Sequence, residues 1–116
     1  MWIVLFALMQ AQVACPATIQ VSQRVMTPPA GWSVDATTTQ THKLSGATLY
    51  DGPPKEQASL VPDSRLPDKS TWLLRPNPRG YYLECRYGEV ALSRRIANEL
   101  KQCELVETKE IRVQCR

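Results

Sequence analysis

The stretch YYLECRYGEVALSRRI, residues 81–96, predicts an antiparallel β-hairpin. Gly88 and Glu89 separate two arms of alternating character, and a glycine at the first central position suits a two-residue type II′ loop. A slip of one residue would turn the apolar face of the hairpin toward water, so we expect the register to be fixed. The predicted pairs are Tyr87 with Val90, Cys85 with Leu92, Leu83 with Arg94 and Tyr81 with Ile96.

In this register the hairpin has one mostly apolar face and one polar face. Arg94 falls on the apolar face opposite Leu83, where a buried unpaired charge would be costly. We expect its side chain to reach outward from a sheet edge; pairing with an acid and contact with a partner protein are the alternatives. The apolar face otherwise consists of Tyr81, Leu83, Cys85, Tyr87, Val90, Leu92 and Ile96, and the polar face of Tyr82, Glu84, Arg86, Ala91, Ser93 and Arg95.

The closing stretch CELVETKEIRVQC, residues 103–115, predicts a second hairpin with its loop at residues 108–110. Its arms alternate so that Cys103 faces Cys115, close enough for a cross-strand disulfide. That pair leaves Cys15 to bond Cys85. Four cysteines allow three pairings, and spacing alone leaves the other two open.

The remaining chain contains further strand patterns and no amphipathic helix of three turns. We expect strands at residues 17–23, 44–50 and 72–75. The Pro- and Thr-rich residues 27–43 are typical of an irregular, exposed loop. Residues 51–60, DGPPKEQASL, are the one helical candidate, of one or two turns with Asp51 as its cap. The sequence therefore predicts a mostly β protein: a single small antiparallel β-sheet domain, meander- or sandwich-like, with one short helical turn and two disulfides.

Residues 1–14, MWIVLFALMQAQVA, contain no charged residue, glycine or proline. An apolar run followed by small residues is typical of a secretory signal peptide, and this run is too short to span a bilayer. Cleavage after Ala14 would leave residues 15–116 as one periplasmic domain without a membrane anchor. A buried N-terminal strand is the alternative.

All four cysteines follow this segment, and an even number in an exported chain favours two disulfides. A lipid on Cys15 is the alternative. It would leave three thiols, one of them unpaired in an oxidising compartment, so parity favours a disulfide.

The formal net charge of +3 arises in the second half of the chain, where residues 65–116 carry eleven basic and seven acidic side chains. The arginines are interspersed with glutamates, and no block of five or six like charges occurs. This pattern predicts a mixed, mildly basic surface. It gives little support to a nucleic-acid partner, and export argues against one.

Residues suited to catalysis are scarce. His42 is the only histidine, it falls in the expected loop, and no CxxC or HxxxH spacing is present for a metal ion. The spacing of Asp51, Glu56 and Glu84 implies no carboxylate pair, and Glu84 is expected to face Ser93 or an arginine. We therefore expect no enzyme activity, no catalytic residue, no metal and no cofactor, while a site assembled only by the tertiary fold stays open.

Tyr82, Arg86 and Arg95 share the polar face of the first hairpin. Aromatic rings and guanidinium groups are enriched at protein–protein interfaces, so these residues, with Arg94, are the candidate partner-binding residues. An ordinary solvated sheet face is the alternative. The tryptophans at 32 and 72 are expected to be core plugs or loop anchors rather than ligand-binding rings.

The order CPA…PAGW…LYDGPP…ASLVPD…WLLRP…YYLECRY…LSRR…C…CR resembles a family of small exported proteobacterial proteins of unknown function. The combination of YDGPP with CRY and a terminal CR is the most specific part, and the resemblance covers nearly all of residues 15–116. It implies a periplasmic, one-domain protein with structural cysteines. The family brings no established catalytic residue.

These features together predict a binding protein for another exported protein, as an inhibitor or as an immunity factor against an envelope-targeted toxin. Charge-assisted hydrogen bonds from arginines would support such binding. An inhibitor of lysozyme is a variant of this hypothesis, although lysozymes are basic and so is this chain. The alternative from a different class is an envelope structural or stress protein without a tight partner.

Overall fold

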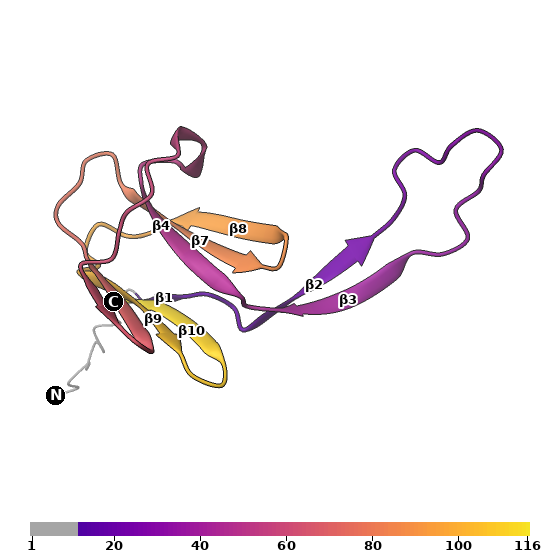
Figure 1. Ribbon diagram of the computed structural model, residues 1–116. Helices are drawn as coiled ribbons and strands as arrows, with labels where there is room; N and C mark the ends of the chain where they lie inside the picture. The colour runs from indigo at the N-terminus through magenta and orange to yellow at the C-terminus, as the bar shows by residue number, and fades with distance from the viewer. Residues whose placement is uncertain (1–11) are drawn as a thin grey trace, which may run out of the picture.

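A computed structural model describes residues 12–116 and shows antiparallel β-structure (Figure 1). The signal peptide expected at residues 1–14 therefore lies mostly outside the described residues. Its last positions do fall inside, and Val13–Ala14 form strand β1.

The strands form three sheets, in which every pairing is antiparallel. A five-stranded sheet has the order β1-β10-β9-β6-β5, a three-stranded sheet has the order β4-β7-β8, and β2 pairs with β3 alone. The elements after β1 are β2 (Thr18–Gln23), β3 (Thr38–Lys43), β4 (Gly46–Asp51), the 3-10 helix η1 (Pro54–Glu56), β5 (Ser64–Leu66), β6 (Lys69–Leu73), β7 (Tyr81–Tyr87), β8 (Val90–Arg95), β9 (Gln102–Glu107) and β10 (Ile111–Cys115).

The hairpin predicted at residues 81–96 is confirmed as β7 and β8. Tyr87 pairs with Val90 and Cys85 with Leu92, as the two-residue loop requires. Gly88 has a φ of 67°, whereas Glu89 keeps a negative φ, which is the sign pattern of a type II′ loop. A local turn residue and alternating arms therefore fixed this register without help from the rest of the chain.

The second hairpin is confirmed as β9 and β10, with Cys115 opposite Cys103 and Val113 opposite Leu105. Both expected disulfides are present. Cys103 bonds Cys115 across the hairpin, and Cys15 bonds Cys85 over a sequence separation of 70 residues. Cys15 also donates its N–H to the carbonyl oxygen of Val113, at 3.0 Å. The long-range disulfide therefore ties the five-stranded sheet to the three-stranded one.

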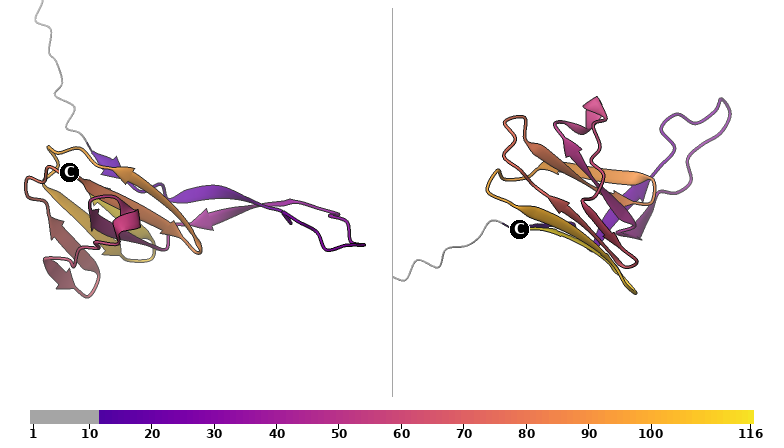
Figure 2. Two further views of the ribbon diagram at one scale, coloured as in Figure 1. Left: turned by 90° about the horizontal axis from the view of Figure 1, so that it is seen from above. Right: turned by 60° about the vertical axis from the view of Figure 1, so that its left-hand side comes forward.

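The core lies between these two sheets (Figure 2). Alternate residues of each strand point inward, as period-two patterning requires. The five-stranded sheet contributes Trp72, Cys103, Leu105, Val113 and Cys115, and the three-stranded sheet contributes Ala47, Leu49, Leu83, Cys85 and Tyr87. The mostly β, sandwich-like class expected from the sequence is confirmed.

The expected loop at residues 27–43 is wrong over its last part, because Thr38–Lys43 form β3 opposite β2. The two strands form an arm that projects from the packed sheets (Figure 1). Threonine favours extended backbone, but every residue from 22 to 41 is exposed. No apolar alternation marks a strand that has no buried face.

The expected helix at residues 51–60 shrinks to the single 3-10 turn η1. The chain doubles back here instead: Leu60 donates its N–H to the carbonyl oxygen of Leu49, and Tyr50 bridges Ser59. Asp51 is not a helix cap, because its carboxylate accepts a hydrogen bond from Asn77 at 2.6 Å. Tertiary pairing thus outweighed a weak helical preference.

The strand expected at residues 72–75 begins earlier, as β6 from Lys69 to Leu73. It pairs with β9 on one side and with β5 on the other. Strand β5 could not be predicted from the sequence, because the exposed residues Ser64–Leu66 carry no alternation.

Candidate functional site

The structure places three of the four candidate partner-binding residues on one face. Tyr82 lies directly opposite Arg95 in the β7–β8 register, and Arg86 lies four residues further along β7, so all three side chains leave the same side of the sheet. Arg94 leaves the opposite side, opposite Leu83. The outer face of the three-stranded sheet therefore presents Tyr82, Arg86 and Arg95 together, without Arg94.

Both arginines of this outer face lie over a glycine. A Cβ atom added at Gly46 would lie 2.8 Å from a guanidinium nitrogen of Arg86, and one added at Gly80 would lie 2.5 Å from Nε of Arg95. Only glycine leaves this space beside the backbone. The two glycines therefore help to set where the guanidinium groups lie.

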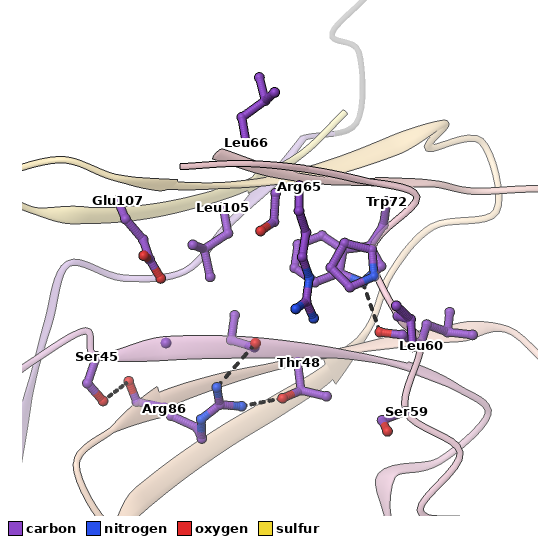
Figure 3. A pocket seen from close by; sticks show the side chains of 15 residues that line it. Ser45, Thr48, Ser59, Leu60, Arg65, Leu66, Trp72, Arg86, Leu105 and Glu107 are labelled. Carbon is purple, nitrogen blue, oxygen red and sulfur yellow. Dashed lines mark hydrogen bonds between the residues drawn. The ribbon is translucent and has the colours of Figure 1, made fainter. Parts of the chain in front are cut away.

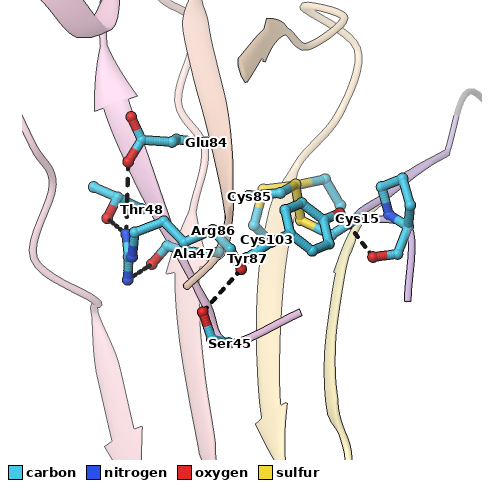
Figure 4. The surroundings of a disulfide bond; sticks show 11 residues. Cys15, Ser45, Ala47, Thr48, Glu84, Cys85, Arg86, Tyr87 and Cys103 are labelled. Carbon is cyan, nitrogen blue, oxygen red and sulfur yellow. Dashed lines mark hydrogen bonds and ion pairs between the residues drawn. A yellow bond between two sulfur atoms is a disulfide. The ribbon is translucent and has the colours of Figure 1, made fainter. Parts of the chain in front are cut away.

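The guanidinium of Arg86 is held by several neighbours (Figure 4). It donates hydrogen bonds to Oγ1 of Thr48 and to the carbonyl oxygen of Ala47, and it forms an ion pair with Glu84 at 3.7 Å. Glu84 also faces Ser93, as expected. Arg86 is thus a positioned group.

Arg94 lies on β8, the edge strand of its sheet, and it is exposed. The side chain of Arg94 can therefore extend outward into water, as expected, because no further strand covers the edge of β8. Beside it, Leu92 is 46% exposed, although it lies on the predicted apolar face. A small cavity of about 200 Å³ lies next to both side chains and reaches Val13, Leu83 and Cys85.

An open cleft with a volume of about 530 Å³ lies between the edge of β4 and the strands β5, β6 and β9 (Figure 3). Arg65 enters the cleft from the wall formed by the five-stranded sheet, and Arg86 enters from the wall formed by the three-stranded sheet. Trp72 and Leu105 lie on the same wall as Arg65, and Glu107 lies at one end. The cleft therefore combines two guanidinium groups with apolar side chains.

Arg65 was missed by the sequence analysis. It lies on β5, which carried no strand signal, and its partner Arg86 is 21 positions along the chain. The side chain of Arg65 is exposed and makes no hydrogen bond or ion pair with any residue from 12 to 116. Only the packing of the two sheets brings the two arginines to one cleft.

The residues considered for catalysis stay apart. His42 is half-buried on β3, not in a solvated loop, and its Nδ1 lies 3.3 Å from the carbonyl oxygen of Tyr87. Glu56 forms an ion pair with Arg79, and no cysteine among residues 12–116 is free. The described part of the chain brings no base next to a nucleophile.

Within residues 12–116, no group of three or more His, Cys, Asp or Glu side chains could hold a metal ion. In the same part of the chain, no helix is long and apolar enough to cross a membrane.

The two tryptophans have different surroundings. Trp72 is 7% exposed and donates its indole N–H to the carbonyl oxygen of Leu60 at 3.0 Å, so the expected core plug is confirmed. Trp32 is 76% exposed at the end of the β2–β3 arm, so the expectation of a core plug is wrong for this residue. Nothing in the local sequence PAGW distinguishes a buried ring from an exposed one.

A protein-family model described as "Type VI secretion system Tli immunity protein" matches residues 38–116. The match covers β3 to β10, and so includes the cleft and both packed sheets except β1. The YDGPP, CRY and CR segments lie inside the matched range, whereas CPA and PAGW lie outside it. Comparisons with curated proteins and with solved structures gave no match.

Proposed function

Because the chain belongs to the type VI secretion system Tli immunity protein family, we propose that it protects the bacterium that carries it by binding a type VI effector and blocking its active surface. The expectation of an immunity factor agrees with this family. The finer points that follow, which concern compartment, binding surface and mechanism, are our proposal.

We place the encounter in the periplasm. The chain contains two disulfides, whose Cα–Cα distances are 5.8 and 4.0 Å. Disulfides persist in oxidising compartments and are rare in the cytosol. The apolar, uncharged segment at residues 1–14 provides a route there as a signal peptide.

The observation that carries the proposed binding mode is the pair of arginines in the cleft. A guanidinium can bind a carboxylate through two parallel hydrogen bonds, and Arg65 has no ionic partner among residues 12–116. An acidic side chain of the effector would complete this site, beside the apolar side chains of Trp72 and Leu105. Exclusion of water there strengthens a charge-assisted contact.

Tyr82 and Arg95 extend the same contact surface over the outer face of the three-stranded sheet. Arg86 belongs to both surfaces, since it lines the cleft and shares the face with Tyr82. Arg94 points to the other side, so one partner surface reaches it only around the edge of β8. The main contact therefore consists of Arg65, Arg86, Tyr82 and Arg95.

We propose that protection is stoichiometric and not catalytic. Titration of a fixed amount of the type VI effector that this chain binds should end at one equivalent of purified protein, with no further inactivation over time. Progressive loss of effector activity at a tenth of an equivalent would instead indicate catalysis. The readout is residual effector activity against incubation time.

The binding surface is tested by reversing the charge of Arg65. We expect Arg65→Glu to weaken binding to the effector by at least about tenfold, because an acid then faces the effector's acid. The matched control is Arg112→Glu, an exposed arginine on β10 away from the cleft. Equal affinities of both variants, measured by calorimetry, would contradict the cleft as the binding site.

A further inference from the structure

The loop that joins β2 and β3, residues 24–37, forms the tip of the projecting arm (Figure 1). We call it the tip loop. All of its residues are exposed, and no hydrogen bond or ion pair joins it to any other part of residues 12–116. Packing against the sheets therefore does not explain the amino-acid composition of the tip loop.

Eight large apolar side chains are exposed among residues 12–116, and four of them lie in this loop. Single exposed apolar residues are ordinary, but a group on one short projecting segment marks an interaction site. Tryptophan and methionine are enriched at protein interfaces. The four are Val25, Met26, Trp32 and Val34, exposed by 54%, 78%, 76% and 41%.

The tip loop has local structure that presents Trp32. The N–H of Trp32 bonds to the carbonyl oxygen of Pro29 at 3.0 Å, which closes a turn. Gly31 has a φ of 88°, the left-handed value that the third position of a type II turn requires. The ring is thus held outward by a defined turn.

The base of the arm is fixed to the body. Ser45 donates its N–H to the carbonyl oxygen of Arg86 on β7 at 2.8 Å. The hydrogen bond from the Leu44 N–H to the carbonyl oxygen of Ala17, at 2.9 Å, holds the two sides of the arm together at its root. Ser45 and Gly46, which follow directly from the arm, also line the cleft. A protein bound in the cleft therefore lies beside the root of the arm.

We propose that the tip loop docks into an apolar recess on the same type VI effector that occupies the cleft, an inference that rests on the proposed function. The cleft supplies polar contacts, and the tip loop supplies apolar ones at a distance. The family match begins at residue 38 and leaves the tip loop out. The tip loop thus adds to the matched part of the chain a contact that is specific to this chain's own effector.

The size and charge of the tip loop favour the effector over other occupants. A stable interface buries about 800 Å² of surface on each partner. Four side chains offer only a few hundred Å² of surface, so contact between two tip loops alone would not hold a dimer together. Stable attachment to a membrane needs a second signal such as a basic cluster. The tip loop carries one base, Arg24, and one acid, Asp35.

The test compares the affinity of the effector for the wild-type chain and for the double variant Met26→Ser/Trp32→Ser. We expect the dissociation constant to rise at least about tenfold, because these anchors lose their recess. A second variant replaces residues 24–37 by Asn-Gly, which suits a two-residue loop because Gln23 and Thr38 are the last pair of the arm. The double variant should keep the unfolding midpoint of the wild type, since both replaced side chains are exposed. The shortened variant should keep at least that midpoint, since a shorter loop costs less entropy to close.

The control is Leu73→Ser, which removes a side chain 56% exposed on β6, outside the arm. Its affinity should equal that of the wild type. If the wild-type chain binds the effector and the tip variants bind it equally well, the docking of the tip loop is overturned while the proposed function stands. If the wild-type chain does not bind, both are overturned.

Fluorine NMR of the 5-fluorotryptophan-labelled chain identifies the occupant. The Trp32 resonance, assigned with Trp32→Phe, should shift when unlabelled effector is added. It should not shift when the protein is concentrated or when phosphatidylglycerol–phosphatidylethanolamine vesicles are added. A shift on concentration would indicate a second copy, and a shift with vesicles a membrane, and either would overturn the assignment to the effector.

Discussion

Tyr87, on β7, contacts both the segment before β2 and strand β3 at the base of the arm. Its side chain is fully buried, and its hydroxyl donates a hydrogen bond to the carbonyl oxygen of Pro16 at 2.7 Å. Its own carbonyl oxygen lies 3.3 Å from Nδ1 of His42 at the base of the arm. Burial raises the pKa of the Tyr87 phenol above its ordinary value of 10.0.

Replacing Tyr87 by phenylalanine removes this hydrogen bond and should lower the free energy of unfolding by about 1 kcal/mol near pH 7. The variant should also change the response to alkali. The unfolded chain releases the phenolic proton above about pH 10, before the folded chain does, so the wild type loses stability as the pH rises through that range. Tyr87→Phe should lose less between pH 9.5 and about pH 11, as urea unfolding at each pH would show.

The control for this comparison is Tyr82→Phe, whose ring lies on the outer face of β7 and is only half-buried. This variant also removes one phenolic hydroxyl, but from a ring outside the core. An identical slope in Tyr87→Phe and the wild type would contradict the role given to burial.

Leu83 and Leu92 lie on the same predicted face of the first hairpin, yet only one of them is in the core. Leu83 is 2% exposed and Leu92 is 46% exposed. We expect Leu83→Ala to cost about 2–5 kcal/mol in the free energy of unfolding, because it leaves a cavity, and Leu92→Ala to cost less than about 1 kcal/mol. Comparable losses in urea denaturation would mean that β8 is covered in solution.

Among the elements, the two hairpins were predictable and the arm was not. A glycine at a turn and arms of period two are local signals, so pairing within residues 81–96 and 103–115 needs no knowledge of distant segments. Strands β3 and β5 are mostly exposed and carry no apolar alternation. Strand β3 is held extended by pairing with β2, and β5 by pairing with β6, which follows after residues 67 and 68.

The Cys103–Cys115 disulfide belongs to this scale, because it closes one hairpin over 12 residues. In the loop-entropy model a crosslink of this length contributes about 3 kcal/mol. The double variant Cys103→Ala/Cys115→Ala should lose that much or less, since the hairpin pairing already restricts its arms. A loss above about 5 kcal/mol by guanidinium unfolding would show that the disulfide does more than close the hairpin.

At the scale of the whole molecule, Cys15–Cys85 has the larger effect. It joins the two packed sheets across a separation of 70 residues, for which the same model gives about 4 kcal/mol. We expect Cys15→Ala/Cys85→Ala to lose more stability than the hairpin variant and to weaken near-ultraviolet circular dichroism from the core around Trp72. The reverse order of stabilities would contradict this assignment.

Export also belongs to this scale. We expect the mature periplasmic protein to begin at Cys15, with all four cysteines crosslinked. Loss of residues 1–14 would remove β1, but the disulfide and the hydrogen bond from Cys15 to Val113 would still hold the new terminus. Intact mass under non-reducing conditions tests this, and an acyl chain or free thiols would contradict it.

Turn residues and alternation, which can be read locally, were enough to predict the mostly β class and the two hairpins with their registers, including Cys103 opposite Cys115. They left the partner of Cys15 open, and they did not show which faces of the sheets are covered. Only the tertiary structure moved Leu92 to an open edge, brought Arg65 beside Arg86, and left Trp32 at the end of an arm. Burial and clefts depend on how separate sheets pack, and no short stretch of the chain encodes that packing.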